Sequence, residues 1–159
     1  MCRMVSYRIG SLFACLIVII VSACGGGNSL SDNARGDSVA VFAAPNMNGG
    51  YPVELDLVFV KSEDVAQAFD IVPAKNWFRN RAAFLASYVG RVEAISYEIL
   101  PGKELLIQNF PIMKSKAAAV FIYANYQAGA KQPRRIRRIG KLLVEMQESE
   151  FFISSENSF

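Results

Sequence analysis

The chain has 159 residues, with 17 lysines and arginines, 14 acidic residues, three cysteines and no histidine. A chain of this length forms one domain with a substantial hydrophobic core. The lack of histidine excludes Ser-His-Asp and Cys-His catalytic sites and removes the commonest metal ligand. We therefore expect a structural or binding protein, with no enzyme activity, no cofactor and no metal.

One alternative chemistry stays open, a hydrolase that uses carboxylates alone. Glu54 and Asp56 are two residues apart in an alternating segment, so they share one face of a predicted strand. Two such carboxylates are far more often solvated side chains on an exposed face, and we interpret them in that way. The chain has no Walker A motif and no dinucleotide-binding glycine pattern.

The first residues have the order of a secretory signal. Arg3 and Arg8 give a positive start, residues 11–21 are apolar, and residues 21–23 are small and precede Cys24. The apolar run is shorter than the about 20 residues that span a membrane. We therefore expect residues 1–23 to be cleaved as a signal peptide.

Cleavage at this point changes the charge and the cysteine content. Two arginines leave with the signal, so 15 basic residues face 14 acidic ones and the mature charge is about +1. Cys2 and Cys15 leave too, and the one remaining cysteine cannot form an intramolecular disulfide. The stability of the mature domain must therefore come from packing.

The residues at the cleavage site, Val21-Ser22-Ala23-Cys24, resemble the lipobox of bacterial lipoproteins. In that family the cysteine thiol is diacylated and the new amine is usually acylated, and several acyl chains make a stable anchor. The resemblance implies an acylated Cys24, the site at which palmitate would enter. Gly25, where enterobacterial inner-membrane lipoproteins have aspartate, implies the periplasmic face of the outer membrane. The alternative is an ordinary or uncleaved signal in which Cys24 has no role.

The segment after Cys24 is polar and rich in glycine. Residues 25–36, GGGNSLSDNARG, cannot bury enough surface to order themselves, so residues 24–36 are predicted to form a lipidated flexible tether. Residues 37–159 are then the folded domain.

Several segments of this domain have strand patterns. The clearest is 53–60, where Val53, Leu55, Leu57 and Phe59 alternate onto one face. Pro101-Gly102 predicts a hairpin between two further strands. The remaining strand candidates are residues 38–43, 91–100, 104–110, 116–126, a final strand within 134–144, and 151–153.

A helical insertion is predicted at about residues 62–88. Its second part places Trp77, Arg81, Phe84 and Tyr88 at three- and four-residue intervals, which is typical of an amphipathic helix. We interpret this aromatic stripe as core packing, with a ligand pocket as the alternative. Six or seven strands with one helical insertion favour a mainly β fold, a β-sandwich.

A basic run follows the apolar strand at 116–126. Arg134, Arg135, Arg137, Arg138 and Lys141 fall within eight residues. They are interpreted either as a contact for lipid phosphates or an acidic partner, or as charges that protect a solvated edge strand. Nucleic acid is not an expected partner in the periplasm.

The order of these features resembles the outer-membrane lipoprotein family of the type VI secretion system (TssJ, also called VasD). The matching features are the lipobox, a first strand at 39–42, a polar loop at 45–52, the alternating strand at 53–60, the helical insertion, the Pro101-Gly102 turn and the apolar strand at 118–126. The resemblance implies a transthyretin-like β-sandwich with a structural role. Such lipoproteins bind the periplasmic C-terminal part of a large inner-membrane partner, TssM.

The resemblance places that contact in the loop between the first two strands. Here the loop is Asn46, Met47, Asn48, Gly49, Gly50 and Tyr51. We expect Met47 and Tyr51 to protrude as anchors, and the loop to add little to folding. Two alternatives stay open: a lipoprotein that assists assembly of a secretin or pilus, like a pilotin, and a solute-binding lipoprotein that uses the wall around Trp77 and Phe84.

Overall fold

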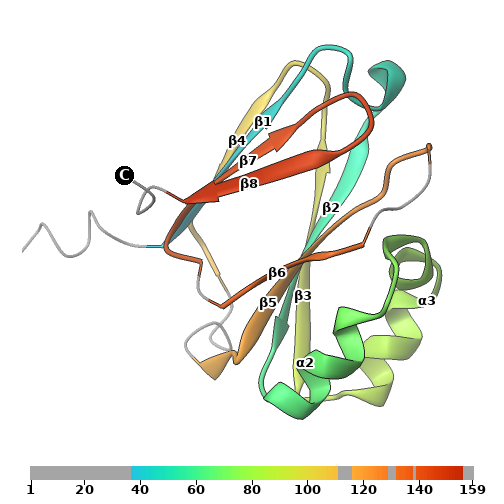
Figure 1. Cartoon of the computed structure of the whole chain (residues 1–159), viewed down its shortest axis with the longest axis vertical. Helices are drawn as coiled ribbons and strands as arrows, with labels where there is room; N and C mark the ends of the chain where they lie inside the picture. Colours follow the sequence, from blue (N-terminus) through green and yellow to red (C-terminus); the bar gives the residue numbers. More distant parts are fainter. Residues whose placement is uncertain (1–36, 111–115, 129–131, 138, 156–159) are drawn as a thin grey trace, which may run out of the picture.

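The computed structural model describes residues 37–110, 116–128, 132–137 and 139–155. These residues form two four-stranded sheets, and two α-helices cover the outside of one of them (Figure 1). Sheet A has the order β4-β1-β7-β8, and sheet B the order β3-β2-β5-β6. The elements are β1 (Ser38–Ala43), η1 (Met47–Gly50), β2 (Val53–Val60), α2 (Glu63–Asp70), α3 (Ala74–Ser87), β3 (Val92–Ile99), β4 (Glu104–Ile107), β5 (Ala119–Ala124), β6 (Arg134–Ile136), β7 (Lys141–Met146) and β8 (Phe151–Ser155). The predicted β-sandwich with a helical insertion is confirmed.

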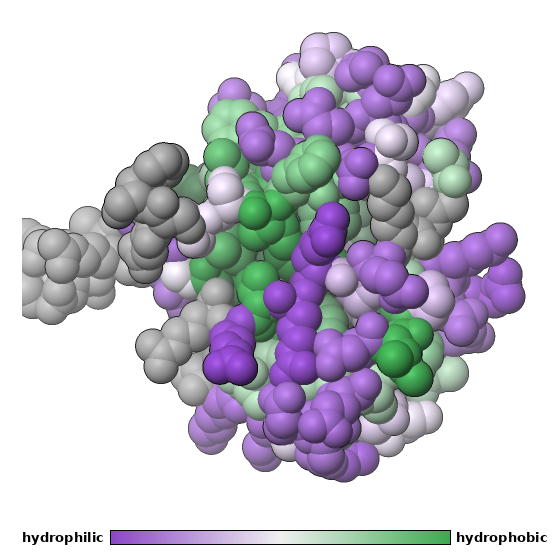
Figure 2. Space-filling model, viewed as in Figure 1, coloured by the Kyte–Doolittle hydropathy of each residue, from purple (hydrophilic) through white to green (hydrophobic). Residues whose placement is uncertain are grey.

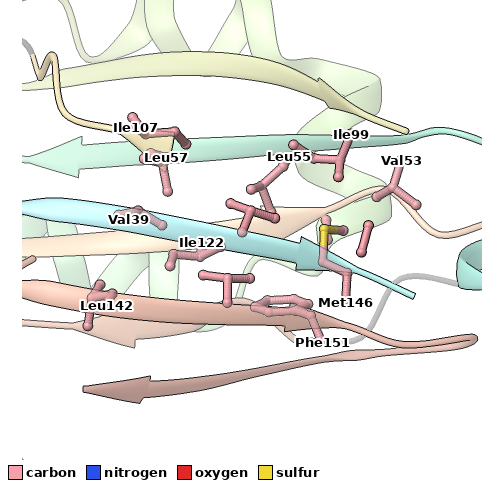
Figure 3. Packing of buried hydrophobic residues seen from close by; sticks show 14 of the residues in the cluster. Val39, Val53, Leu55, Leu57, Ile99, Ile107, Ile122, Leu142, Met146 and Phe151 are labelled. Atoms are coloured by element: carbon pink, nitrogen blue, oxygen red, sulfur yellow. The ribbon is translucent and has the colours of Figure 1, made fainter. Parts of the chain in front are cut away.

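The alternating side chains of the strands fill the space between the two sheets. Leu55 and Leu57 of β2 lie on the same face of sheet B as Ile122 of β5 and point toward Val39 of β1 in sheet A, and all four side chains have no exposed surface (Figure 3). In sheet B, β2 is an interior strand and pairs antiparallel with both β3 and β5. In sheet A, β1 pairs antiparallel with β4 and parallel with β7. In the view of Figure 1, hydrophobic residues gather on the side where β8 and β6 lie, and hydrophilic residues predominate over the helices (Figure 2).

The helices bury the outer face of sheet B. Val58 and Val60 of β2 are as fully buried as the residues on its other face, because α2 and α3 pack over them. The ring of Trp77 on α3 stacks on Tyr123 of β5, with centroids 5.2 Å apart, and Phe69 of α2 lies 5.9 Å from Trp77. The aromatic stripe therefore packs into a second core, as predicted. None of the described helices is long and apolar enough to cross a membrane.

The hairpin predicted at Pro101-Gly102 is wrong. The turn itself forms, since Gly102 has a φ of +69° and the N–H of Lys103 donates to the carbonyl of Leu100 at 3.2 Å. However, β3 lies in sheet B, whereas β4 lies in sheet A and pairs with β1. The turn crosses from one sheet to the other, because each strand finds its partner in a different sheet.

The C-terminal strands are also more numerous than predicted. The single strand expected within 134–144 is two strands in different sheets, with β6 at the edge of sheet B and β7 inside sheet A. Gly140, with a φ of +53°, lies in the connection, and its carbonyl accepts the N–H of Ser38 at 2.7 Å. The described residues therefore form eight strands rather than six or seven.

We predict that Leu57→Ala destabilises the domain by about 2–5 kcal/mol, because it leaves a cavity between the sheets. The matched control is Leu106→Ala in β4, whose side chain is 58% exposed. That change should cost less than about 0.5 kcal/mol. Urea unfolding of both variants measures the difference, and equal losses would contradict the assigned strand register.

Candidate partner-binding site

The loop between β1 and β2 lies at one end of the sandwich and is hydrogen-bonded to three neighbouring turns. The backbone N–H of Asn48 donates to the carbonyl of Glu148 in the β7–β8 turn at 2.9 Å. The N–H of Gln127, beyond the end of β5, donates to Oδ1 of Asn48 at 2.8 Å. The N–H of Gly102 donates to the carbonyl of Ala44 at 3.3 Å. We call this end of the molecule, with η1 and these three turns, the tip.

Asn48 determines the shape of the loop. Its φ of 51° is left-handed, a conformation that asparagine tolerates better than most residues. The side chain is buried, and its Nδ2 donates to the carbonyl of Pro52 at 3.2 Å. Gly49 and Gly50 follow, also with positive φ. The loop is therefore a fixed turn clamped by one asparagine, rather than a flexible connection.

The expectation that Met47 protrudes is wrong. Met47 has no exposed surface and belongs to the core between the sheets, because an apolar side chain at this point gains more from packing than from exposure. The loop therefore contributes to folding, contrary to our expectation. Tyr51 is 59% exposed, and Asn46, Gly49 and Gly50 are exposed as well. Of the two expected anchors, the structure leaves Tyr51 at the surface.

A shallow hollow lies directly beside the loop. Its walls come from the start of β2, the end of β3 and the end of β5, with Pro52, Glu54, Ser96, Tyr97, Glu98 and Asn125. Glu54 and Glu98 are register partners on neighbouring strands, so two carboxylates face the same space. Partial burial raises the pKa of Tyr97. The exposed Tyr51, beside these carboxylates, suits contact with a protein that presents apolar and basic side chains.

The interpretation of Glu54 and Asp56 as solvated carboxylates is wrong for Asp56. The two residues do share a face, but α3 covers it, and Asp56 has no exposed surface. Trp77 Nε1 donates to Asp56 Oδ2 at 2.7 Å, and Arg81 Nη1 donates to the same oxygen at 3.0 Å. Arg81 Nη1 also bonds to Glu54 and, at 2.9 Å, to Ser96 Oγ. The carboxylates therefore anchor a helix, which explains their spacing without any catalysis.

We call the bonds from Trp77 and Arg81 to Asp56 and Glu54 the α3 clamp, which was not predicted from the sequence. The pKa of Arg81 is raised, first by its hydrogen bond to Glu54 and then by Asp56, which favours the charged guanidinium. A signal was present, because Trp77 and Arg81 are four residues apart on the apolar stripe of the predicted helix. A cation on a buried face requires a carboxylate opposite, and Asp56 was the candidate.

The arginine cluster does not form one surface. Arg135 turns toward α2, where its guanidinium donates to Glu63 at 2.6 Å and to Asp70 at 2.7 Å and lies over the ring of Phe121. Its pKa is raised, mainly by the bond to Glu63. Arg134 and Arg137 are exposed, so β6 has the character of a charged edge strand. Arg138 and the proposed lipidation site Cys24 lie outside the described residues. The described part of the chain contains no cluster of side chains suited to a metal ion.

We predict that Arg81→Met destabilises the domain by about 2–4 kcal/mol, because it leaves the buried Asp56 carboxylate without its cation. The matched control, Arg79→Met on the exposed side of the same helix, should cost less than about 0.5 kcal/mol. Adding Asp56→Asn to Arg81→Met should recover part of the loss, since the amide oxygen still accepts from Trp77. Thermal or urea unfolding measures all three, and an Arg81→Met variant as stable as the control would refute the clamp.

This fold was compared with those of known proteins. No protein-family model and no curated protein sequence matches the chain significantly. Among solved structures, the type VI secretion lipoprotein TssJ1 from Pseudomonas aeruginosa superposes with a TM-score of 0.59 at 17% identity, over 77% of this chain and 96% of that one. Serratia marcescens Lip, described as a membrane-bound component of the type VI secretion system, gives a TM-score of 0.54 at 12% identity, over 76% and 96%.

A third structure is described as the type VI secretion protein TssM C-terminal domain from EAEC. One of its chains superposes with a TM-score of 0.54 at 12% identity, over 74% of this chain and 96% of that one. The share of each chain that is covered shows that the likeness extends over nearly the whole described domain. The chain therefore has the β-sandwich fold of the type VI secretion lipoproteins.

Proposed function

We propose that this protein is a TssJ-like lipoprotein that ties a type VI secretion membrane complex to the outer membrane. The observation that carries the proposal is the shared fold, which extends over 96% of both compared lipoproteins and presents an exposed tyrosine on a rigid tip. None of the three comparison structures is described as an enzyme, which fits the absence of histidine and a structural role.

The anchor is the first part of this role. Acyl chains on Cys24, at the end of the tether formed by residues 24–36, would hold the domain at the periplasmic face of the outer membrane. The described structure supports this arrangement, because β1 begins at Ser38 and leads away from the tether toward the tip. A short segment would then join the domain to the anchor. The tip lies beyond Ala43, at the end of β1 that is farther from the anchor.

Binding of a TssM-like inner-membrane partner is the second part. The contact surface is the tip, with Tyr51 as the aromatic anchor and Asn46, Gly49 and Gly50 around it. Met47 and Asn48 support this surface from below. Met47 fills the core, and Asn48 fixes the backbone of the loop. A loop already held in one conformation loses little entropy on binding, which favours affinity.

The solute-binding alternative is weakened by the packing of α3. Trp77 has no exposed surface, and its ring is enclosed by Tyr123, Phe84 and Phe69. The wall that was to receive a solute is therefore filled by the chain's own aromatic side chains.

Lipidation of Cys24 is tested by Cys24→Ser in cells grown with radiolabelled palmitate. Serine lacks the thiol that the acyltransferase needs, so the label should be lost and the protein should leave the membrane fraction. Cys15→Ser is the matched control, because it also removes a thiol but lies within the predicted signal, and it should keep the label. Label that persists in Cys24→Ser would contradict the lipoprotein assignment.

The tip is tested by Tyr51→Ala in binding to the periplasmic domain of the cognate TssM-like protein. Loss of an aromatic anchor should weaken binding by about 2 kcal/mol, or roughly thirtyfold, while the stability changes by less than about 0.5 kcal/mol. Ile71→Ala is the control, since Ile71 is 79% exposed but lies at the end of α2, in the helical insertion. Calorimetry or surface plasmon resonance measures both, and equal affinities would place the interface elsewhere.

A further inference from the structure

Basic side chains from separate segments gather at the end of the sandwich opposite the tip. Lys61 follows β2, and its N–H donates to the carbonyl of Arg91 at 2.9 Å, which places these two residues side by side. Lys116 precedes β5, and two residues further the N–H of Ala118 donates to the carbonyl of Val60 at 2.8 Å. Lys61, Arg91 and Lys116 are all exposed.

Two more basic residues extend this group toward the start of β1. Arg137 follows Ile136, which is the register partner of Val120 near the start of β5. Lys141 is the register partner of Ser38, the first residue of β1. Both basic residues are exposed. We call the group the basic end, and its members are Lys61, Arg91, Lys116, Arg137 and Lys141.

Carboxylates at this end do not cancel the positive charge. Asp64 lies 3.9 Å from Arg91, and its pKa is lowered chiefly by a hydrogen bond from Ser62, so it is ionised at neutral pH. Glu63 is already bonded to Arg135 of β6. Among the residues that the structure describes, the remaining carboxylates at this end are Asp37 and Glu93. Basic residues stay in excess, and they come from positions scattered between 61 and 141.

The tip has the opposite balance. Glu98, Glu104, Glu145 and Glu148 are exposed there, at the ends of β3 and β7, the start of β4 and the β7–β8 turn. Within the described ranges, the exposed basic residues toward that end are Lys103 and Arg134. The charge of the described residues is therefore polarised along the strands, positive where β1 begins and negative where β1 ends.

We propose that the basic end binds the anionic phospholipid headgroups of the leaflet that carries the lipid anchor. The inference rests on the proposed function for the anchor itself, since residues 24–36 would join the domain at Ser38, within the basic end. A flexible segment of that length has a mean end-to-end distance of about 20 Å, so the basic end stays close to the headgroups. The anchor makes this contact effectively intramolecular, and a weak attraction is then enough to orient the domain. The tip is turned away from the membrane, toward its partner.

The test uses the mature chain from residue 24 with Cys24→Ser, so that no acyl group contributes, and flotation with lipid vesicles. It should bind vesicles of phosphatidylethanolamine and phosphatidylglycerol but not vesicles of phosphatidylcholine alone. Binding should vanish as ionic strength rises from about 0.1 M to about 1 M, because the screening length falls from about 10 Å to about 3 Å. The double variant Lys116→Glu/Arg137→Glu should lower binding more than about tenfold.

The matched control is Lys75→Glu/Arg79→Glu on the exposed side of α3, which changes the net charge by the same amount. It should keep vesicle binding, and an equal loss in both double variants would overturn the proposal, because net charge alone would then explain the attraction. Lack of binding to phosphatidylglycerol vesicles would overturn it too. So would displacement by inorganic phosphate beyond that by chloride at the same ionic strength, since it would indicate a site for free phosphate.

These measurements are separate from those of the proposed function. Vesicle binding is measured without acyl chains and without a partner, so it stands or falls independently of palmitate labelling and of binding through Tyr51. Lys116→Glu/Arg137→Glu should bind the TssM-like domain as the original chain does. Loss of partner binding in that variant would contradict the separation of the two ends.

Discussion

Burial of β2 on both faces is the constraint on which the rest of this structure depends. One face supplies Leu55 and Leu57 to the space between the sheets, and the other lies beneath α2 and α3. The second face includes Asp56, a charge with no exposed surface. A buried carboxylate needs a cation and hydrogen-bond donors, and α3 brings both in Arg81 and Trp77. The position of the helical insertion on sheet B is therefore determined by the charge it neutralises as well as by its apolar stripe.

The same strand determines the position of the tip. The loop from Asn46 to Tyr51 ends two residues before β2 begins, and Met47 returns to the core that β2 and β1 share. Asn48 then bonds to residues near the ends of β5 and β7. Tyr51 is thereby held on elements from both sheets. The proposed binding residue is thereby presented in one geometry, which is the usual way in which loops carry function on a rigid scaffold.

The sequence predicted what depends on local pattern. Alternation in residues 53–60 predicted β2, helical periodicity predicted the insertion, and the apolar run at 116–126 predicted the central strand β5. What depended on distant partners was missed. Pro101-Gly102 makes a turn in either topology, so it did not reveal that β3 and β4 lie in different sheets. Met47 stands in a polar loop, and its burial follows from the space left between β1, β2 and β7, which no local pattern reports. The sequence did not distinguish Arg135 from the neighbouring arginines, because its partners Glu63 and Asp70 are distant in the chain.

The direction of β1 relates the proposed anchor to the proposed partner-binding site. Its six residues span roughly 20 Å at about 3.3 Å per residue, from the basic residues around Ser38 to the tip beyond Ala43. Two other strands have the same charge polarity. β7, beside β1, begins at Lys141 and ends beside the β7–β8 turn, and β2, in sheet B, begins at the tip and ends beside Lys61. A molecule tied at one end of such strands has its other end directed away from the membrane whenever the strands stand upright. In the proposed arrangement, a flexible tether at residues 24–36 cannot impose that orientation, since it would transmit no torque. The separation of basic and acidic side chains can, because an anionic leaflet attracts one end and repels the other. In this proposed arrangement the surface charges of the domain would orient it, which a lipid anchor alone would not do.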